Sequence, residues 1–92
     1  MARLAISTDI GFGAQVGTPD ALFELGMLYA TGRDVVADLV AAHKWFNIAA
    51  ARGSEAALKR RVEIAREMSG KEIAEAQRQA REWLQTNVAA RA

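Results

Sequence analysis

The residues of this chain that could support catalysis or metal binding are few and lie apart from one another. The chain has no cysteine and a single histidine, His43, so neither a disulfide nor a thiolate metal site can form, and no cluster has the spacing of metal ligands. Asp34 and Asp38 lie four residues apart, but they straddle a loop and a helix start, with no second acid or base placed to share proton transfer. We therefore predict that the protein is not an enzyme and holds no metal and no cofactor.

Other residues in suggestive positions are better explained by structure. His43 is expected to project from its helix away from the face that carries Trp45, and therefore to be exposed. Ser7 has no context for nucleophilic chemistry, while Ser54 and Ser69 read as helix N-caps. The larger aromatic residues could stack on a ligand, but their helical spacing favours a place in the core: Trp45, Phe46 and Trp83.

The stretch LGMLYATGRDVVAD, residues 25–38, contains two glycines in a mainly apolar context. A phosphate-binding loop needs a different glycine spacing and a following lysine–serine pair, and the chain has neither. The same residues suit a break between two packed helices, because Gly32 can end one helix in the left-handed conformation and Asp38 can cap the next. The stretch is therefore predicted to be the turn of a helical hairpin.

Composition indicates one small helical domain. The chain has 92 residues, of which 51% are hydrophobic and 25% are charged, with one proline and a formal net charge of +1. This is a globular balance that favours helix. No apolar run approaches the roughly 20 residues of a membrane span, and the N-terminus does not resemble a secretory signal, so we expect a cytoplasmic protein that binds no membrane.

Start and stop signals predict four helices, over residues 19–31, 38–51, 54–68 and 71–86. Thr18, Asp38, Ser54 and Ser69 are the expected N-caps, although Gly70 could instead end the preceding helix. Residues 1–17 are interrupted by glycines and are expected to be irregular. Short turns favour two antiparallel helical hairpins, so the fold class is all-α. Helical spacing predicts one inward face for each helix. The first two faces are Ala21, Leu22, Leu25, Leu28 and Tyr29 on the first helix, and Ala42, Trp45, Phe46 and Ala49 on the second. The other two are Leu58, Val62 and Ala65 on the third helix, and Ile73, Ala76, Ala80, Trp83 and Leu84 on the fourth.

A dozen spaced residues resemble one complete Sel1-like repeat, a tetratricopeptide-like unit of α/α solenoids. They are Ala21, Leu25, Gly26, Tyr29, Gly32, Val35, Asp38, Ala42, Trp45, Phe46, Ala49 and Gly53. The resemblance implies a repeat domain over 18–92, with a full repeat at 19–53 and a degenerate closing repeat at 54–86. It also implies a protein–protein interaction module that acts as an adaptor or scaffold.

The resemblance assigns a role to each residue of the turn. Gly26 lets the two helices of the hairpin approach closely, Tyr29 packs across the hairpin, and Val35 closes the loop onto the core. The family has a second glycine where this chain has Asp34. Aspartate tolerates the left-handed backbone better than most residues, so the turn is expected to form.

Phe23 and Met27 form a second apolar face on the first helix, opposite the stripe that contains Leu25 and Leu28. Residues 1–17, a second copy in a two-fold dimer, or a bound peptide could cover this face. We predict a shallow groove that holds a peptide or partner protein by helix-in-groove burial with polar edges. Its predicted residues are Phe23, Met27, Arg60, Glu63 and Glu67.

Two other functions fit the same sequence. One is a self-associating or capping fragment of a longer solenoid, because such folds need about three repeats to bury a continuous core. The other is a nucleic-acid binder that uses the basic residues of the third helix. Such a run is more often a solvated face paired with Glu63 and Glu67, so nucleic acid is an unlikely partner. The basic residues are Lys59, Arg60, Arg61 and Arg66.

Overall fold

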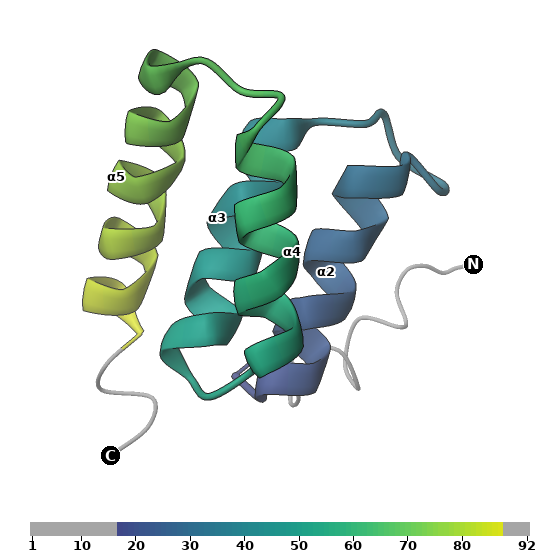
Figure 1. Ribbon diagram of the computed structural model, residues 1–92. Coiled ribbons are helices and arrows are strands. Elements are labelled where there is room, and N and C mark those ends of the chain that lie inside the picture. Colours follow the sequence, from purple (N-terminus) through teal and green to yellow (C-terminus); the bar gives the residue numbers. More distant parts are fainter. Residues whose placement is uncertain (1–16, 88–92) are drawn as a thin grey trace.

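The computed structural model describes residues 17–87, and within this range the chain forms four helices and no strand (Figure 1). They are α2 (Pro19–Thr31), α3 (Leu39–Ala51), α4 (Glu55–Ala65) and α5 (Gly70–Thr86). The predicted all-α fold is confirmed, although α4 ends at Ala65 rather than at residue 68. The segment predicted to be irregular, 1–17, lies outside the described residues except for Gly17.

A side-chain cap fixes the start of each described helix. Thr18 Oγ1 accepts the backbone N–H of the third residue of α2 at 3.2 Å, and Pro19 occupies the first helical position. Asp38 and Ser54 cap α3 and α4 in the same way, at 3.1 and 3.0 Å. Each cap satisfies a backbone donor that the helix itself leaves unpaired. Local sequence therefore sets three helix starts.

The start of α5 is a complete capping box. The backbone N–H of Glu72 donates to Ser69 Oγ at 3.1 Å, and the backbone N–H of Ser69 donates to the Glu72 carboxylate at 2.8 Å. Gly70 is consequently the first residue of α5 and does not end α4. The capping box is the alternative that the structure selects.

The turn between α2 and α3 forms around two left-handed residues. Gly32 has φ +74° and Asp34 has φ +67°, so aspartate adopts the conformation expected where the family has glycine. The backbone N–H of Asp38 donates to the carbonyl of Tyr29 at 3.0 Å and closes the turn. The prediction that Val35 closes the loop onto the core was wrong, because Val35 is 36% exposed and is not among the residues that pack against the core.

Close contact between α2 and α3 forms the centre of the core. Leu22 and Phe46 are fully buried, and a Cβ atom at residue 26 would lie 2.4 Å from two carbon atoms of the Phe46 ring. Gly26 therefore allows the ring to lie against the α2 backbone. The buried residues of α2 are Leu22 and Gly26. Of the predicted stripe, Leu22 is therefore fully buried, and the other four members are half-buried: Ala21, Leu25, Leu28 and Tyr29.

Helix α3 is the central element of the described fold, because α2, α4 and α5 all pack against it (Figure 1). The four helices alternate in direction, but α5 makes little contact with α4. Its contact with α3 includes an edge-to-face pair of Trp45 and Trp83, whose ring centroids lie 5.7 Å apart. The predicted inward face of α5 is confirmed at Ala76 and Ala80, which are buried.

The predicted inward face of α4 was wrong. Ala57 is fully buried and Ile64 packs against the core, whereas Leu58 and Val62 are 43% and 49% exposed. The α4–α3 contact uses the small residue Ala57, and successive helical residues point about 100° apart. The larger aliphatic side chains therefore lie on the flank of α4.

We expect Gly26→Ala to lower the free energy of unfolding by roughly 1 kcal/mol. The added methyl group overpacks the core at a cost of about 1–3 kcal/mol, and the higher helix propensity of alanine offsets about 1 kcal/mol of that cost. Urea unfolding followed by circular dichroism measures the change. Gly70→Ala is the matched control, since no atom lies within 4 Å of a Cβ atom there. Equal effects of the two substitutions would contradict the close approach of α2 and α3.

Candidate functional site

The predicted anchor residues of α2 pack partly against the core of the α2–α3 hairpin. Phe23 and Met27 are half-buried and pack against the core, and the Phe23 ring centroid lies 5.7 Å from that of Phe46. The second apolar face of α2 is therefore less open than the sequence indicated. What remains of it is the exposed portion of these two side chains.

The predicted polar edge lies on α4, which makes a small contact with α2. Arg60, Glu63 and Glu67 are all exposed. Arg60 Nη1 lies 3.2 Å from Glu63 Oε1, in an ion pair within one helical turn. The predicted anchors and the predicted polar edge thus belong to two helices that touch. No hydrogen bond or ion pair joins the two sets within residues 17–87.

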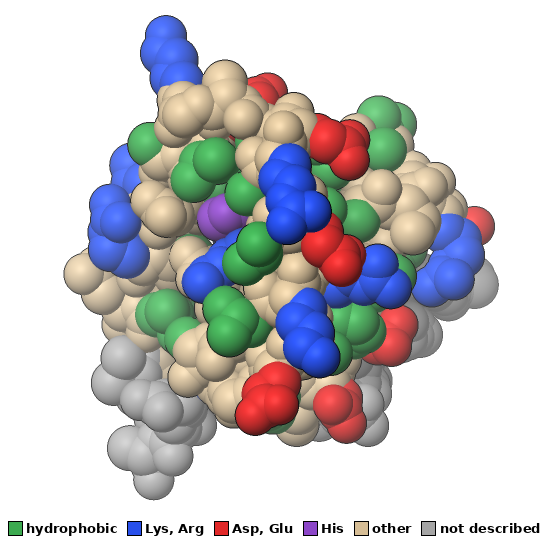
Figure 2. Space-filling view, viewed as in Figure 1, with side chains coloured by type: hydrophobic (Ala, Val, Ile, Leu, Met, Phe, Trp, Pro, Cys, Tyr) green, Lys and Arg blue, Asp and Glu red, His purple; other side chains and the backbone are tan. Residues whose placement is uncertain are grey.

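A surface that the sequence analysis missed lies on the flank of α4. Leu58 and Val62 are exposed side chains one helical turn apart, and we call them the Leu58–Val62 patch. On the face seen in Figure 2, hydrophobic side chains lie among those of Lys and Arg. The sequence did contain a signal for this surface. Leu58 with Val62, and Ala57 with Ile64, both have the spacing of a helix face, so either pair could have been the inward face of α4.

The basic residues of α4 do not form one continuous surface. Arg60 pairs with Glu63, and Arg61 is half-buried and donates from Nη1 to Asn47 Oδ1 of α3 at 2.7 Å. Lys59 and Arg66 are exposed and have no ion-pair partner within the described part of the chain. The four cations proposed for nucleic-acid binding therefore point in different directions.

His43 is buried, which corrects the prediction that it is exposed. Its side chain is only 3% exposed, and its Nδ1 atom has no hydrogen-bond partner among the described residues. Asn47, one helical turn further along α3, accepts a hydrogen bond from Arg61 of α4, so this side of α3 faces α4. Burial lowers the pKa of His43, and the positive charge of Arg61 lowers it further. A neutral imidazole is thus held at the α3–α4 contact.

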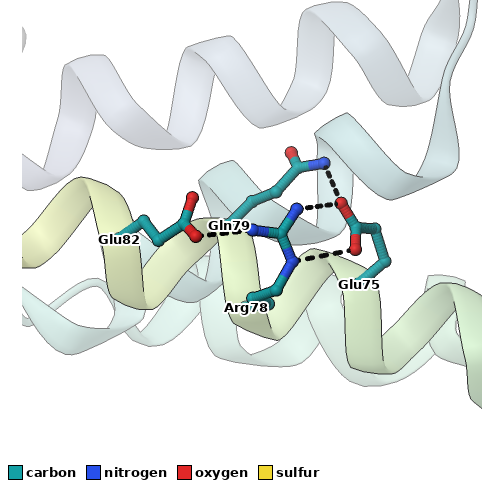
Figure 3. A network of polar contacts seen from close by, with 4 residues as sticks. All are labelled: Glu75, Arg78, Gln79 and Glu82. Atoms are coloured by element: carbon teal, nitrogen blue, oxygen red, sulfur yellow. Dashed lines mark hydrogen bonds and ion pairs between the residues drawn. The ribbon is translucent and has the colours of Figure 1, made fainter.

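A charged network runs along the outer side of α5 (Figure 3). Arg78 lies between two carboxylates, with Nε 3.0 Å from Glu75 Oε1 and Nη1 2.5 Å from Glu82 Oε2. Gln79 also donates to Glu75, at 2.8 Å. Hydrogen bonds from Arg78 and then Gln79 lower the pKa of Glu75 to about 2. The network borders two open depressions beside α3, whose linings include Val40 and Lys44.

Two other classes of site are not found among the described residues. No three His, Asp or Glu side chains in the range 17–87 gather where they could hold a metal ion. In the same range, no helix has the length and apolar character needed to cross a membrane.

The stability of the fold should depend on pH through His43. Its pKa in the unfolded chain is near 6.5 and is lower in the folded protein, so the unfolded state binds more protons as the pH falls. The stabilisation by the neutral ring is complete above pH 6.5 and is lost as the pH falls through the folded pKa. We expect His43→Gln to flatten the dependence of unfolding free energy on pH between about pH 5 and 7. An unchanged slope in urea unfolding would contradict the burial of a neutral imidazole.

The lowered pKa of Glu75 should depend on Arg78. We expect Arg78→Gln to raise it from about 2 toward 4.5, the ordinary glutamate value, in an NMR titration of the side-chain carboxyl carbon. Because the network is exposed, its contribution to stability is small; that contribution is present above pH 4.5 and is lost as the pH falls toward 2. Arg81→Gln is the matched control, since Arg81 has no ion pair among the described residues. If the pKa of Glu75 responded equally to both substitutions, the pairing with Arg78 would not be its cause.

Comparison with known proteins identifies the hairpin that carries most of these contacts. A family model of the Sel1 repeat matches residues 19–54, the span of α2, the turn, α3 and the N-cap of α4. No curated protein and no solved structure matches the chain. Sel1 repeats are generally protein–protein interaction modules and are typically non-enzymatic. The matched part of the chain is therefore a Sel1-like repeat, and helices α2 and α3 form it.

Proposed function

We propose that this protein is an adaptor or scaffold module that binds a peptide or another protein through the surface shared by α2 and α4. The Sel1 repeat at 19–54 is the observation that carries the proposal, because repeats of this family generally bind proteins. We interpret α4 and α5 as the closing part of the repeat domain, which presents one more helix beside α2.

The chemistry of this surface supports protein binding. Phe23 and Met27 keep part of their surface accessible on α2, a helix that contacts α4, and apolar anchors of this kind supply most of the binding energy at interfaces. Arg60 and Glu63 are 51% and 55% exposed and already held in a pair. They provide a polar edge of both signs around the anchors.

Self-association is a second candidate, and the small size of the core favours it. The largest fully buried side chains among the described residues are Phe46, Leu22 and Ile48. One full repeat buries less apolar surface than the stacks of three or more in which such units are usually stable. A two-fold dimer or a longer solenoid would extend this core.

Quantitative affinity capture from the source cells, followed by titration of the purified partner, tests the proposed module. We expect the double substitution Arg60→Glu with Glu63→Arg to weaken binding at least tenfold, about 1.4 kcal/mol. The exchange preserves the net charge and the spacing of the pair but reverses the charges that a partner meets. Circular dichroism verifies that the fold is retained.

The matched control is the same exchange on α5, Glu75→Arg with Arg78→Glu, which reverses another pair spaced three residues apart. This control should bind like the wild type. Equal binding by all three proteins would overturn the predicted surface. Capture only of a second copy of the chain, with a doubled mass in light scattering, would favour self-association.

A further inference from the structure

We propose that the Leu58–Val62 patch binds the apolar face of an acidic amphipathic helix from another protein. The inference rests on the proposed function as a protein-binding module, and it adds a surface on the other flank of α4 together with the chemistry of the partner. This surface is separate from the predicted anchors Phe23 and Met27.

The spacing of the patch fits the side chains of a helix. Leu58 and Val62 are 43% and 49% exposed and lie four residues apart, so they project from the same side of α4. Together they present an aliphatic surface one turn long in an otherwise polar flank. A partner helix with apolar residues at positions i, i+3 and i+4 would bury both side chains at once.

The charges around the patch favour a partner that carries carboxylates. Lys59 and Arg66 are exposed on the same flank by helical spacing, and neither has an ion pair within residues 17–87. By contrast, the described structure already pairs Arg60 and Arg78 with glutamates. The acids of α4 near these cations are Glu55 in the first turn, where it complements the helix dipole, and Glu63, which is already paired with Arg60.

The same charges disfavour a second copy of this chain as the occupant. A two-fold interface places a surface on the equivalent surface of its partner. In an antiparallel pair of α4 helices centred on the Leu58–Val62 patch, Lys59 would lie close to its own copy, and opposed like charges are costly at an interface. An acidic helix from a different protein buries the same apolar pair and neutralises both cations.

Two synthetic peptides provide the test. Both are helical and share one stripe of leucines, and they differ only in glutamate or lysine at the positions that flank the stripe. We expect the glutamate peptide to bind the full chain at least tenfold more tightly in fluorescence anisotropy. Amide shifts in NMR spectra should change mainly along residues 55–66. Preference for the lysine peptide, or shifts elsewhere, would overturn the proposal.

Substitutions on α4 sharpen the result. Leu58→Ser with Val62→Ser should abolish binding of the glutamate peptide while circular dichroism is retained, because both side chains are exposed. Lys59→Glu with Arg66→Glu should reverse the preference between the two peptides, whereas Lys71→Glu with Arg81→Glu on α5, the matched control, should leave it unchanged. A mass in light scattering that falls on Leu58→Ser with Val62→Ser would identify a second copy as the occupant and overturn the proposal.

The captured partner separates the two proposals. If Leu58→Ser with Val62→Ser retains the partner and the exchange at Arg60 and Glu63 loses it, the module stands and the patch proposal fails. If both variants retain the partner, both surfaces fail. If Leu58→Ser with Val62→Ser loses the captured partner, and the wild type prefers the glutamate peptide, the results support an acidic helix as the occupant of the patch.

Discussion

The close approach of α2 and α3 at Gly26 is the contact on which the other helices depend. The Phe46 ring occupies the space where any other side chain on residue 26 would begin, and the same ring contacts Phe23. Fixing Phe46 also fixes the rotation of α3, because its remaining side chains follow at helical intervals. Trp45 is thereby directed to α5, while His43 and Asn47 are directed to α4. The Sel1 repeat thus supplies the frame on which both closing helices pack.

Helix α4 has a different relation to this frame from that of α5. It packs on α3 through the small residue Ala57 and adds a hydrogen bond from Arg61 to Asn47. Because α5 makes little contact with α4, the flank that carries Leu58 and Val62 gains no cover from a described helix. A fully closed second hairpin would bury such a flank. The separation of α4 and α5 explains why aliphatic side chains with core spacing are exposed.

The local elements could be predicted from the sequence, and their mutual orientation could not. Thr18, Asp38, Ser54 and Ser69 act on neighbouring backbone groups, so their capping roles follow from short segments. The burial of His43 depends on α4, which begins more than ten residues later in the chain. Two faces of α4 have helical spacing, one with Leu58 and one with Ala57, and only the packing against α3 shows that the face with Ala57 is buried. The binding role of Phe23, Met27, Arg60, Glu63 and Glu67 stays a prediction, since Phe23 also serves the core.

The contact between α3 and α4 links the exposed flank of α4 to a buried polar group that lacks a hydrogen-bond partner. Arg61 belongs to the same helix turns as Leu58 and Val62, and its guanidinium reaches Asn47 beside His43. The histidine has an unpartnered Nδ1 and is kept neutral by burial and by this guanidinium. A proton on His43 would place two cations together in a confined space, at the position where α4 is held. A change in the charge of His43 would therefore act at the same contact that positions α4 and its Leu58–Val62 patch.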